Sequence, residues 1–464
     1  MKQIKNFLIL TLLCIGTTNV FAQSGDFGTG DALHWELSGV TLTISGTGDI
    51  PDYWPNDGPF GPQPWYEYRS QIEHVEIEYG ATKIGHGAFA ECDQMVSVSI
   101  PNSVEMIAVL AFFNCTSLAS IFIPESVVTI EGGHVVFVNC FGLTSFEVDN
   151  KNPSYSSEEG VLFDKDKTVL LSYPAKKPSV SYTVPKSVTL IGGWEFAGAA
   201  LTSIEVESGS LSYSSVDGVL FDYGKTTLVR YPMSKAGEYT IPDEVTAIGS
   251  AGFWRCSGLT AITIGNDITT IENMAFSFCT NLATIVIPES VTSMGEQVFW
   301  GCNNLASVYI LGDISIIKEE TFLGCDGLFD IYVKSPEPPE VADENAFDEV
   351  DTSECKLHVP HGSKKKYEDA KGWGLFRNII EEKEIISIEP NALAGAVSVS
   401  PNPVTDYFYI SGIEESTPIT LLDVIGKVVL QTVAVPGEAV SVAHLPQGMY
   451  ILQVAGETVK VIKN

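Results

Sequence analysis

Positive charge is scarce in this chain. Its 464 residues include 26 Lys and Arg against 58 Asp and Glu, which gives a formal net charge of −32 and a pI near 4.4. Binding to nucleic-acid phosphates depends on Lys and Arg, so we expect no nucleic-acid partner, and anionic membrane surfaces are disfavoured for the same reason. The acidity permits basic partners or divalent cations, and it also suits the simpler role of keeping an exported protein soluble.

The chain also has no apolar stretch long enough to cross a bilayer, which takes about 20 residues in a helix. The apolar run at residues 7–15 is too short; it follows Lys2 and Lys5, and a Val-Phe-Ala step ends at Ala22. This order is typical of a secretory signal peptide. We therefore predict that residues 1–22 are removed by cleavage after Ala22, and that the mature chain has no transmembrane segment.

Signatures of catalysis are missing too. The sequence contains no phosphate-binding loop, no nucleophile elbow and no HExxH motif. Its 7 His form no evident triad with Ser and Asp. We therefore expect no enzyme and no cofactor.

Metal-binding patterns are weak. The spacing Cys355-x-x-His358-x-x-His361 invites a zinc interpretation, but residues of a strand alternate between faces and a fourth ligand is not evident. The pair Asp164-x-Asp166 could touch Ca²⁺, yet it lacks the EF-hand loop pattern, so a polar turn is the better interpretation. We expect no metal site.

One short phrase recurs through most of the chain. Copies begin at Ile84 and Ile107, and again at Ile248, Ile271 and Met294, with consecutive starts in each array 23 residues apart. A fixed period of this size is the signature of a stacked solenoid. The clearest copy reads Ile271, Ala275-Phe276, Cys279, Leu282, Ile285-x-Ile287-Pro288, Val291 and Met294.

The stretch Leu282-x-x-Ile285-x-Ile287 fits the core pattern of leucine-rich repeats. Ile285 and Ile287 occupy alternate positions, so one face of a strand points inward. Pro288 ends the strand because it has no N–H to donate. One repeat cannot bury these apolar side chains alone, whereas stacked neighbours can. We therefore predict a mainly β fold, a leucine-rich-repeat solenoid with a parallel sheet on one face.

The 9 cysteines of an exported protein would ordinarily suggest a disulfide framework. Neighbouring side chains of a parallel sheet lie about 4.8 Å apart, whereas a disulfide needs Cβ atoms about 3.8 Å apart. We therefore predict a ladder of free, buried thiols. Seven cysteines share one repeat position: Cys92, Cys115, Cys140, Cys256, Cys279, Cys302 and Cys325.

Breaks in the period predict the domain organisation. Near the end of the chain the pattern changes to a period of two with turn signals, which is typical of a small β-sandwich. The predicted parts are a signal peptide at 1–22, an N-terminal cap at 23–83, the solenoid at 84–383 with a C-terminal cap near 340–383, a linker at 384–394 and the sandwich at 395–464.

Two inserts interrupt the solenoid, near residues 150–185 and 208–242. Both contain the sequence Gly-Val-Leu-Phe-Asp, which begins at Gly160 and again at Gly218. We expect each insert to be a β-hairpin, with turns near Asp166-Lys167 and Tyr223-Gly224.

The N-terminal cap contains a loop rich in Pro, Gly and aromatic residues. We interpret it as a cover for the open end of the solenoid core. A carbohydrate site on Trp54, Trp65 and Tyr66 is the alternative.

A candidate binding surface follows from the alternation of the strands. Residues between the inward positions point outward and form continuous rows, and solenoids commonly bind partners on such a face. One row is small and polar, and the other holds aromatic residues of the kind found at hot spots. Exposed aromatics that are simply good strand formers remain the alternative. The candidates are Phe122, Glu147, Glu205, Val286, Tyr309 and Tyr332.

The phrase Ala-Phe-x-x-Cys-x-x-Leu-x-x-Ile-x-Ile-Pro resembles the BspA-type leucine-rich repeats of bacterial surface proteins, over roughly residues 28–383. The paired Gly-Val-Leu-Phe-Asp inserts are similar to that family too. The resemblance implies a surface or secreted protein, and some members bind host matrix proteins or other cells.

The last part of the chain resembles the C-terminal sorting domain of the type IX secretion system of Bacteroidetes. This resemblance implies export through the outer membrane by that machinery, with the domain usually removed and the rest attached to the surface or released. A plain structural β-sandwich is the alternative. The matching motifs are Ser400-Pro401-Asn402-Pro403, Asp423-x-x-Gly426-Lys427, Leu445-Pro446-x-Gly448-Met449-Tyr450 and Lys460-x-x-Lys463.

These observations predict a secreted or cell-surface binding protein that adheres to macromolecules of a host or a neighbouring cell. Its ligand would be a protein or a glycan. The alternatives are a glycan-binding surface protein and a structural spacer of the cell envelope, which would have no discrete ligand.

Overall fold

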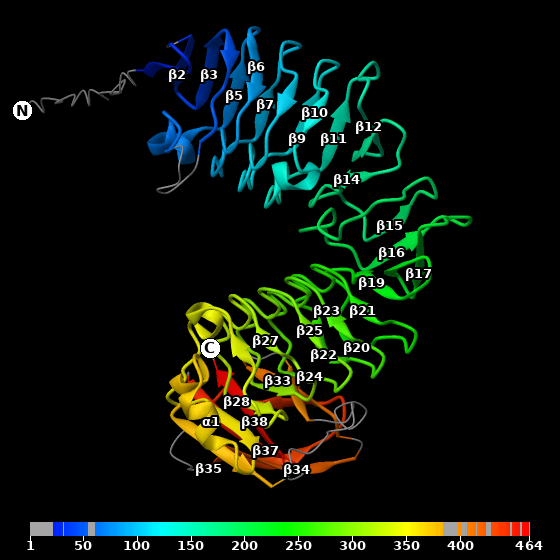
Figure 1. Ribbon diagram of the computed structural model, residues 1–464, viewed down its shortest axis with the longest axis vertical. Coiled ribbons are helices and arrows are strands. Elements are labelled where there is room, and N and C mark those ends of the chain that lie inside the picture. The colour runs from blue at the N-terminus through cyan, green and yellow to red at the C-terminus, as the bar shows by residue number, and fades with distance from the viewer. Residues whose placement is uncertain are drawn as a thin grey trace, which may run out of the picture. The chain divides into compact units, whose positions relative to one another are not determined.

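The computed structural model describes residues 22–30, 32–53, 61–383 and most of 397–463. The predicted linker at 384–394 and all but the last residue of the predicted signal peptide lie outside these ranges. Within them, no helix is long and apolar enough to span a membrane. The chain forms two compact units, residues 1–155 and 156–464, and many of the strands of each are labelled in Figure 1.

The first unit opens with an antiparallel meander that continues into parallel coils. Its long-strand sheet has the order β1-β2-β3-β5-β7, and a sheet of short strands has the order β10-β8-β6-β4. Strands β9 and β11 pair in parallel. The bounds are β1 (Gln23–Phe27), β2 (Leu33–Ser38), β3 (Thr41–Gly46), β4 (Gly48–Asp49), η1 (Tyr66–Gln71), β5 (His74–Ile77), β6 (Ala81–Ile84), β7 (Ser97–Ser99), β8 (Met106–Ile107), β9 (Ser120–Ile123), β10 (Thr129–Ile130), η2 (Gly133–Phe137) and β11 (Ser145–Val148).

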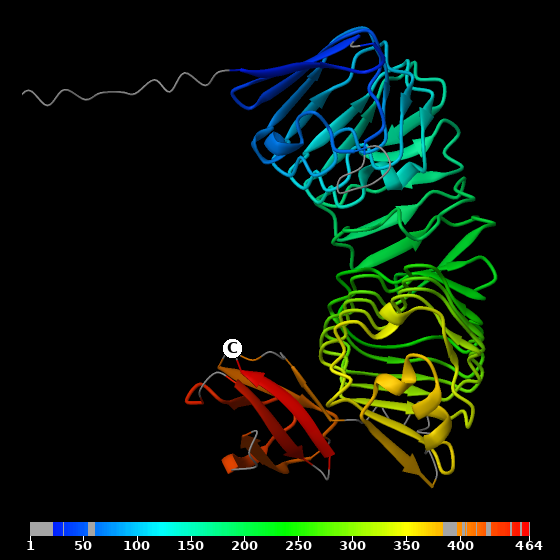
Figure 2. The same cartoon turned by 60° about the vertical axis from the view of Figure 1, so that its left-hand side comes forward.

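The second unit continues the coils with two kinds of parallel sheet. Long strands form β24-β26-β28-β30-β31, β15-β16 and β20-β22, and short strands include β21-β23-β25 and β27-β29. Figure 2 shows successive coils of this unit lying over one another. The bounds are β15 (Ser181–Val184), β16 (Ser203–Val206), β20 (Gly237–Thr240), β21 (Ala247–Ile248), β22 (Leu259–Thr263), β23 (Thr270–Ile271), β24 (Thr284–Ile287), β25 (Ser293–Met294), β26 (Ser307–Ile310), β27 (Ile316–Ile317), β28 (Asp330–Val333), β29 (Glu340–Val341), η3 (Glu344–Phe347), β30 (Lys356–Pro360) and β31 (Asn378–Glu382). The predicted mainly β solenoid is confirmed.

Two ladders run through the core of the coils. Phe276 stacks on Phe299 with ring centroids 5.7 Å apart, and Phe299 stacks on Phe322 at 5.5 Å. Beside them, the thiol of Cys302 donates to the carbonyl oxygen of Phe276 at 3.1 Å. All eight described cysteines are buried and free, which confirms the prediction for the seven that share a repeat position and adds Cys355. Equivalent side chains thus meet in these consecutive coils, which fixes the register between them.

The N-terminal cap closes its end of the core with aromatic packing. Trp65 is fully buried, meets Phe27 edge-on at 5.4 Å and stacks on Phe89 at 5.7 Å. Its indole N–H donates to the carbonyl oxygen of Ala88 at 3.2 Å. A carbohydrate site on Trp65 is therefore wrong, because no face of the ring is available to a ligand. Trp54 lies outside the described residues.

The C-terminal cap combines a helix, a 3₁₀ turn and the last strand of the sheet. The bounds of the first two are α1 (Lys364–Asp369) and η4 (Trp373–Leu375). Tyr367 and Trp373 are buried, and they donate hydrogen bonds of 2.8 Å each to the backbone carbonyls of Ser335 and Pro339. The cap thereby binds the proline-rich segment that leads into it.

The inserts differ from the predicted hairpins, because each contains three strands. Their orders are β12-β13-β14 and β17-β18-β19, with turns at the predicted positions between the last two strands of each. The third strand of the second insert, β19, pairs with β18 of the insert on one side. On its other side it pairs in parallel with β21 of the solenoid, with Leu228 opposite Ile248. That pairing makes the insert part of the solenoid wall. The bounds are β12 (Tyr155–Glu158), β13 (Val161–Asp164), β14 (Leu170–Ser172), β17 (Tyr213–Val216), β18 (Val219–Asp222) and β19 (Thr227–Arg230).

Asp164 and Asp222 hold the turns of the two inserts. Asp164 accepts hydrogen bonds from Thr168 N at 2.6 Å and Val169 N at 2.9 Å. Asp222 accepts from Thr226 Oγ1 at 2.7 Å and Thr227 N at 2.8 Å. The preferred interpretation of Asp164 as a turn residue is therefore confirmed.

Seven strands coloured orange to red in Figure 2 form the C-terminal sandwich. Its two sheets, β32-β33-β36 and β35-β34-β37-β38, share one apolar core. Gly448 and Lys463 of the sorting motifs lie opposite each other on β37 and β38. Pro401, Asn402, Pro403 and Gly426 lie outside the described residues. The bounds are β32 (Ser398–Ser400), β33 (Tyr407–Ser411), β34 (Thr417–Asp423), β35 (Val428–Ala434), β36 (Ala439–Ser441), β37 (Gly448–Val454) and β38 (Glu457–Lys463).

The buried thiols make the native protein resistant to alkylation. Burial raises the pKa of Cys92, Cys256 and Cys302 to about 12, and the thiolate is the reactive form. We expect a chain that begins at Gln23 to show no fast reaction with iodoacetamide at neutral pH, and full alkylation in denaturant, as measured by mass spectrometry. Rapid labelling of any ladder cysteine in the folded chain would contradict this arrangement.

Candidate binding surface

The candidate surface lies on the outward face of the long strands β24, β26, β28 and β30. These strands pair in parallel with aligned register, so Val286, Tyr309, Tyr332 and His358 occupy one row. The inward neighbours Val308, Ile331 and Leu357 are fully buried. Strand alternation therefore places the row on the outside of the core.

Three rings of this row form a continuous stack. Tyr309 and Tyr332 lie 4.4 Å apart with an interplanar angle of 6°, and Tyr332 and His358 lie 4.1 Å apart at 14°. The spacing is close to the separation of neighbouring strands, about 4.8 Å. Both tyrosines are partly exposed. The stack thus offers a rigid edge of aromatic area whose shape is set by the backbone.

His358 ends the stack between two carboxylates. Its Nδ1 lies 2.8 Å from Glu382 Oε1 and its Nε2 lies 3.0 Å from Asp330 Oδ1, and the residue is 7% exposed. Burial alone lowers the pKa of His358, but the hydrogen bonds and charges of Asp330 and Glu382 outweigh it, so the pKa lies above the ordinary value of 6.5. Both ring nitrogens are engaged, which leaves neither for a metal. Within the described residues, no cluster of three metal-ligating side chains occurs.

The predicted site residues fall in three separate places. Val286 lies beside Tyr309 but is only 5% exposed, so it supports the stack and offers little contact area. Phe122, which is 45% exposed, lies opposite Glu147 on β9 and β11 of the first unit. Glu205 on β16 accepts hydrogen bonds from the hydroxyls of Ser203 and Ser215 at 2.6 and 3.1 Å.

The outward rows that we predicted end at Tyr332. They therefore miss His358 and its contacts with the carboxylates of Asp330 and Glu382. From Tyr332 to His358 the chain takes 26 residues instead of 23, because the proline-rich segment adds length. The strand at Leu357-His358-Val359 is recognisable in the sequence, and aligning it with β28 would have found the histidine. Glu382 could not be found this way, because β31 belongs to the C-terminal cap, which has no repeat pattern.

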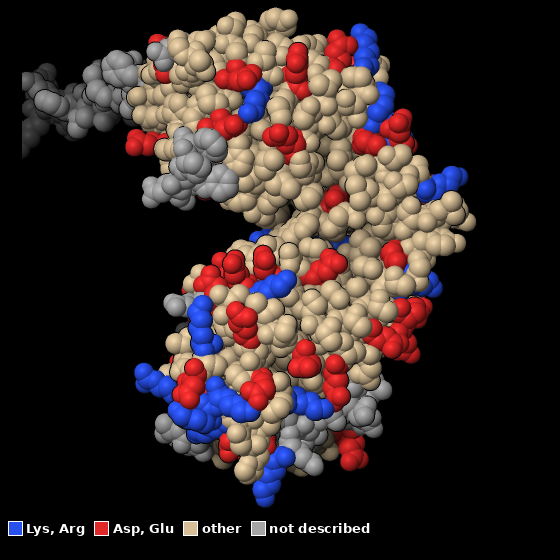
Figure 3. Space-filling model, in the orientation of Figure 1, with Lys and Arg blue, Asp and Glu red and all other residues tan. Residues whose placement is uncertain are grey.

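Charge is unevenly spread over the face of the molecule seen in Figure 3. Basic side chains gather around α1, whereas acidic side chains are scattered over the coils. The lysines of α1 are largely committed to the cap itself. Lys364 donates to the carbonyl oxygen of Ile379 at 2.9 Å, Lys365 pairs with Asp369 at 2.7 Å, and Lys366 pairs with Glu337.

Comparison with known proteins defines the class of the chain. Residues 63–159 and 230–353 match the family described as "BspA type Leucine rich repeat region", in six copies. Residues 398–464 match the "Secretion system C-terminal sorting domain". This protein is therefore a leucine-rich-repeat solenoid. Its repeats are of the BspA type, and it carries a secretion sorting domain, which points to secretion and to the cell surface.

Solved structures of similar fold have low sequence identity to the chain. A leucine-rich repeat protein from Eubacterium ventriosum ATCC 27560 is 26% identical, with coverage of 73% of this chain and 84% of that one and a TM-score of 0.47. The pneumococcal vaccine antigen PcpA is 20% identical, with coverage of 76% and 98% and a TM-score of 0.42. A leucine rich cell surface protein from Faecalibacterium prausnitzii A2-165 is 18% identical, with coverage of 69% and 95% and a TM-score of 0.35. No curated protein matches the chain.

The contacts of His358 with Asp330 and Glu382 make the stability of the C-terminal coils depend on pH. Because the pKa of His358 is raised in the folded state, its contribution to stability is complete below the unfolded pKa of about 6.5 and is lost as the pH rises through the folded value. We expect the urea concentration at the unfolding midpoint to decrease as the pH rises above about 6.5, and His358→Gln to remove that part of the decrease. The exposed His361 gives a matched control, since His361→Gln should keep the wild-type pH profile. If the pH dependence of the urea midpoint were unchanged in His358→Gln, the proposed contribution of the contacts with Asp330 and Glu382 would be refuted.

Proposed function

We propose that this protein is displayed on the cell surface and adheres to a macromolecule of a host or a neighbouring cell. The observation that carries the proposal is the stack of Tyr309, Tyr332 and His358 on the outward sheet face. The sorting domain supports the location. The signal peptide ending at Ala22 remains part of the proposal, as does transfer through the type IX secretion machinery.

The stack suits the recognition of a protein. Aromatic residues supply large contact area at hot spots, and side chains that are already ordered lose little entropy on binding. Tyr309 and Tyr332 would form the centre of the contact. The side chains of the neighbouring row, in which Ser307 lies opposite Asp330, are short and polar. A partner could therefore approach the backbone closely.

Phe122 and Glu147 would give a second point of contact on the first unit. Phe122 is exposed beside small polar neighbours, among them Ser120 on the same strand. The contribution of Glu205 would be smaller, because its carboxylate is already satisfied by Ser203 and Ser215.

A binding screen tests the proposal. The full mature chain would be applied to arrays of extracellular-matrix proteins and glycans at physiological salt. We expect a protein hit that weakens about 10-fold or more in Tyr309→Ala and in Tyr332→Ala, as hot-spot tyrosines do. Tyr79→Ala is the matched control, because Tyr79 is 78% exposed and belongs to the other unit. Silence on both arrays would favour a structural spacer, and a glycan hit indifferent to both tyrosines would move the site elsewhere.

The sorting role of residues 395–464 makes a separate prediction. In the source bacterium, deletion of this segment should retain the solenoid inside the cell envelope, because the secretion machinery would lose its recognition signal. Cell fractionation and surface proteolysis measure the outcome. A truncated chain that still reaches the surface would show that the domain is only a structural β-sandwich.

A further inference from the structure

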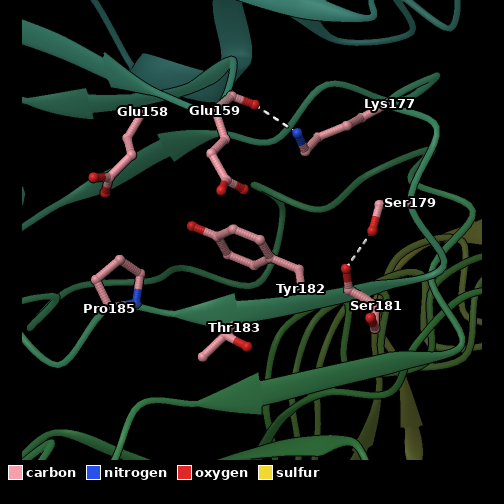
Figure 4. A pocket seen from close by; sticks show the side chains of 8 residues that line it. All are labelled: Glu158, Glu159, Lys177, Ser179, Ser181, Tyr182, Thr183 and Pro185. Atoms are coloured by element: carbon pink, nitrogen blue, oxygen red, sulfur yellow. Dashed lines mark hydrogen bonds between the residues drawn. The ribbon is translucent and has the colours of Figure 1, made fainter.

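A cavity of about 360 Å³ lies at the first insert of the second unit, between the β12–β13 turn and strand β15. Figure 4 shows its lining, with Glu158 and Glu159 on one side, Tyr182 in the middle, and Lys177 and Ser179 on the other side. This size is within the range of pockets that bind small ligands.

The charges around the cavity leave one carboxylate available. Glu158 pairs with Lys167 at 2.9 Å, and Lys177 donates to the backbone carbonyl of Glu159 at 2.6 Å. The carboxylate of Glu159 has no hydrogen bond or ion pair within the described part of the chain. It lies over the ring of Tyr182 in Figure 4.

A buried hydroxyl at the cavity points to a polar ligand independently. Tyr173 is 2% exposed, and its hydroxyl makes no hydrogen bond of good geometry to any described residue. Burial raises the pKa of Tyr173. Among the residues that line the cavity, the Ser179 hydroxyl lowers this pKa and the Glu159 carboxylate raises it. The ring of Tyr173 lies 5.0 Å from that of Tyr182, which lines the cavity, and an unpaired buried hydroxyl is costly.

We propose that this cavity binds a basic side chain of a protein partner, with its cationic group between the Glu159 carboxylate and the Tyr182 ring. A carboxylate forms strong charge-assisted hydrogen bonds with an ammonium or guanidinium group, and the face of an aromatic ring attracts the same cations. The hydroxyls of Tyr173 and Ser179 would orient the bound group. The overall charge of −32 favours the approach of a basic partner.

The second insert provides an internal comparison. Lys235 donates to the carbonyl oxygen of Asp217 at 2.9 Å, as Lys177 does to Glu159. The rings of Tyr231 and Tyr239 lie 4.9 Å apart, close to the 5.0 Å between Tyr173 and Tyr182. Val216, however, replaces the first of the two acidic residues. The second insert therefore offers less negative charge and should bind a cation more weakly.

The test uses the full mature chain and Nα-acetyl-lysine methylamide as the probe, observed by saturation-transfer NMR. Glu159→Gln should weaken binding of the probe about 10-fold, since a hydrogen bond to a charged group is lost. The backbone carbonyl that holds Lys177 is kept in this variant. Asp217→Asn is the matched control and should retain binding. Circular dichroism verifies that both variants are folded.

Three outcomes would overturn the inference. They are equal binding to the Glu159→Gln and wild-type chains, equal binding of the probe after Nε-acetylation, and binding of glucose in preference to the lysine probe. The inference rests on the proposed function in one respect only, namely that the partner is a protein. Tyr309→Ala should leave probe binding unchanged, so failure of the cavity and failure of the aromatic stack are distinguishable.

Discussion

Contact between equivalent side chains of consecutive coils is the constraint on which this structure depends. No single coil encloses a core, so each Phe and each Cys of the ladders needs its counterpart in the next coil. The thiol of Cys279 donates to the carbonyl oxygen of Phe253 at 3.0 Å, and the next cysteine repeats the contact one coil later. This alignment also fixes the outer face. Tyr309 and Tyr332 stack because the residues beneath them are in register.

The core could be predicted from the sequence, because the same residue types recur at the same spacing and are buried at the same position of each repeat. The prediction weakened where pairing is decided by distant parts of the chain. Leu228 belongs to an insert in sequence but pairs with Ile248 of the next coil, a contact that no local pattern reveals. Trp65 illustrates another limit, since an aromatic loop residue looks the same whether it covers a core or faces a ligand. The candidate surface itself followed from alternation, but Val286 shows that an outward position is not always an exposed one.

The two binding features differ in physical character. The aromatic stack is an extended edge held rigid by the sheet, and it suits a broad contact that excludes water. The cavity proposed as a site at the first insert is small and holds one carboxylate, that of Glu159, without an ion pair among the described residues, and it suits a single charged group. A protein partner with a basic side chain near an apolar patch would combine both kinds of chemistry.

The free thiols have a consequence for how the protein matures. The described coils are held together by non-covalent contacts, and no disulfide bond among their cysteines has to form before the native state is reached. Folding then depends neither on an oxidising compartment nor on a thiol isomerase, and reductants outside the cell do not loosen the structure. The described coils therefore need the same contacts in reducing and in oxidising surroundings.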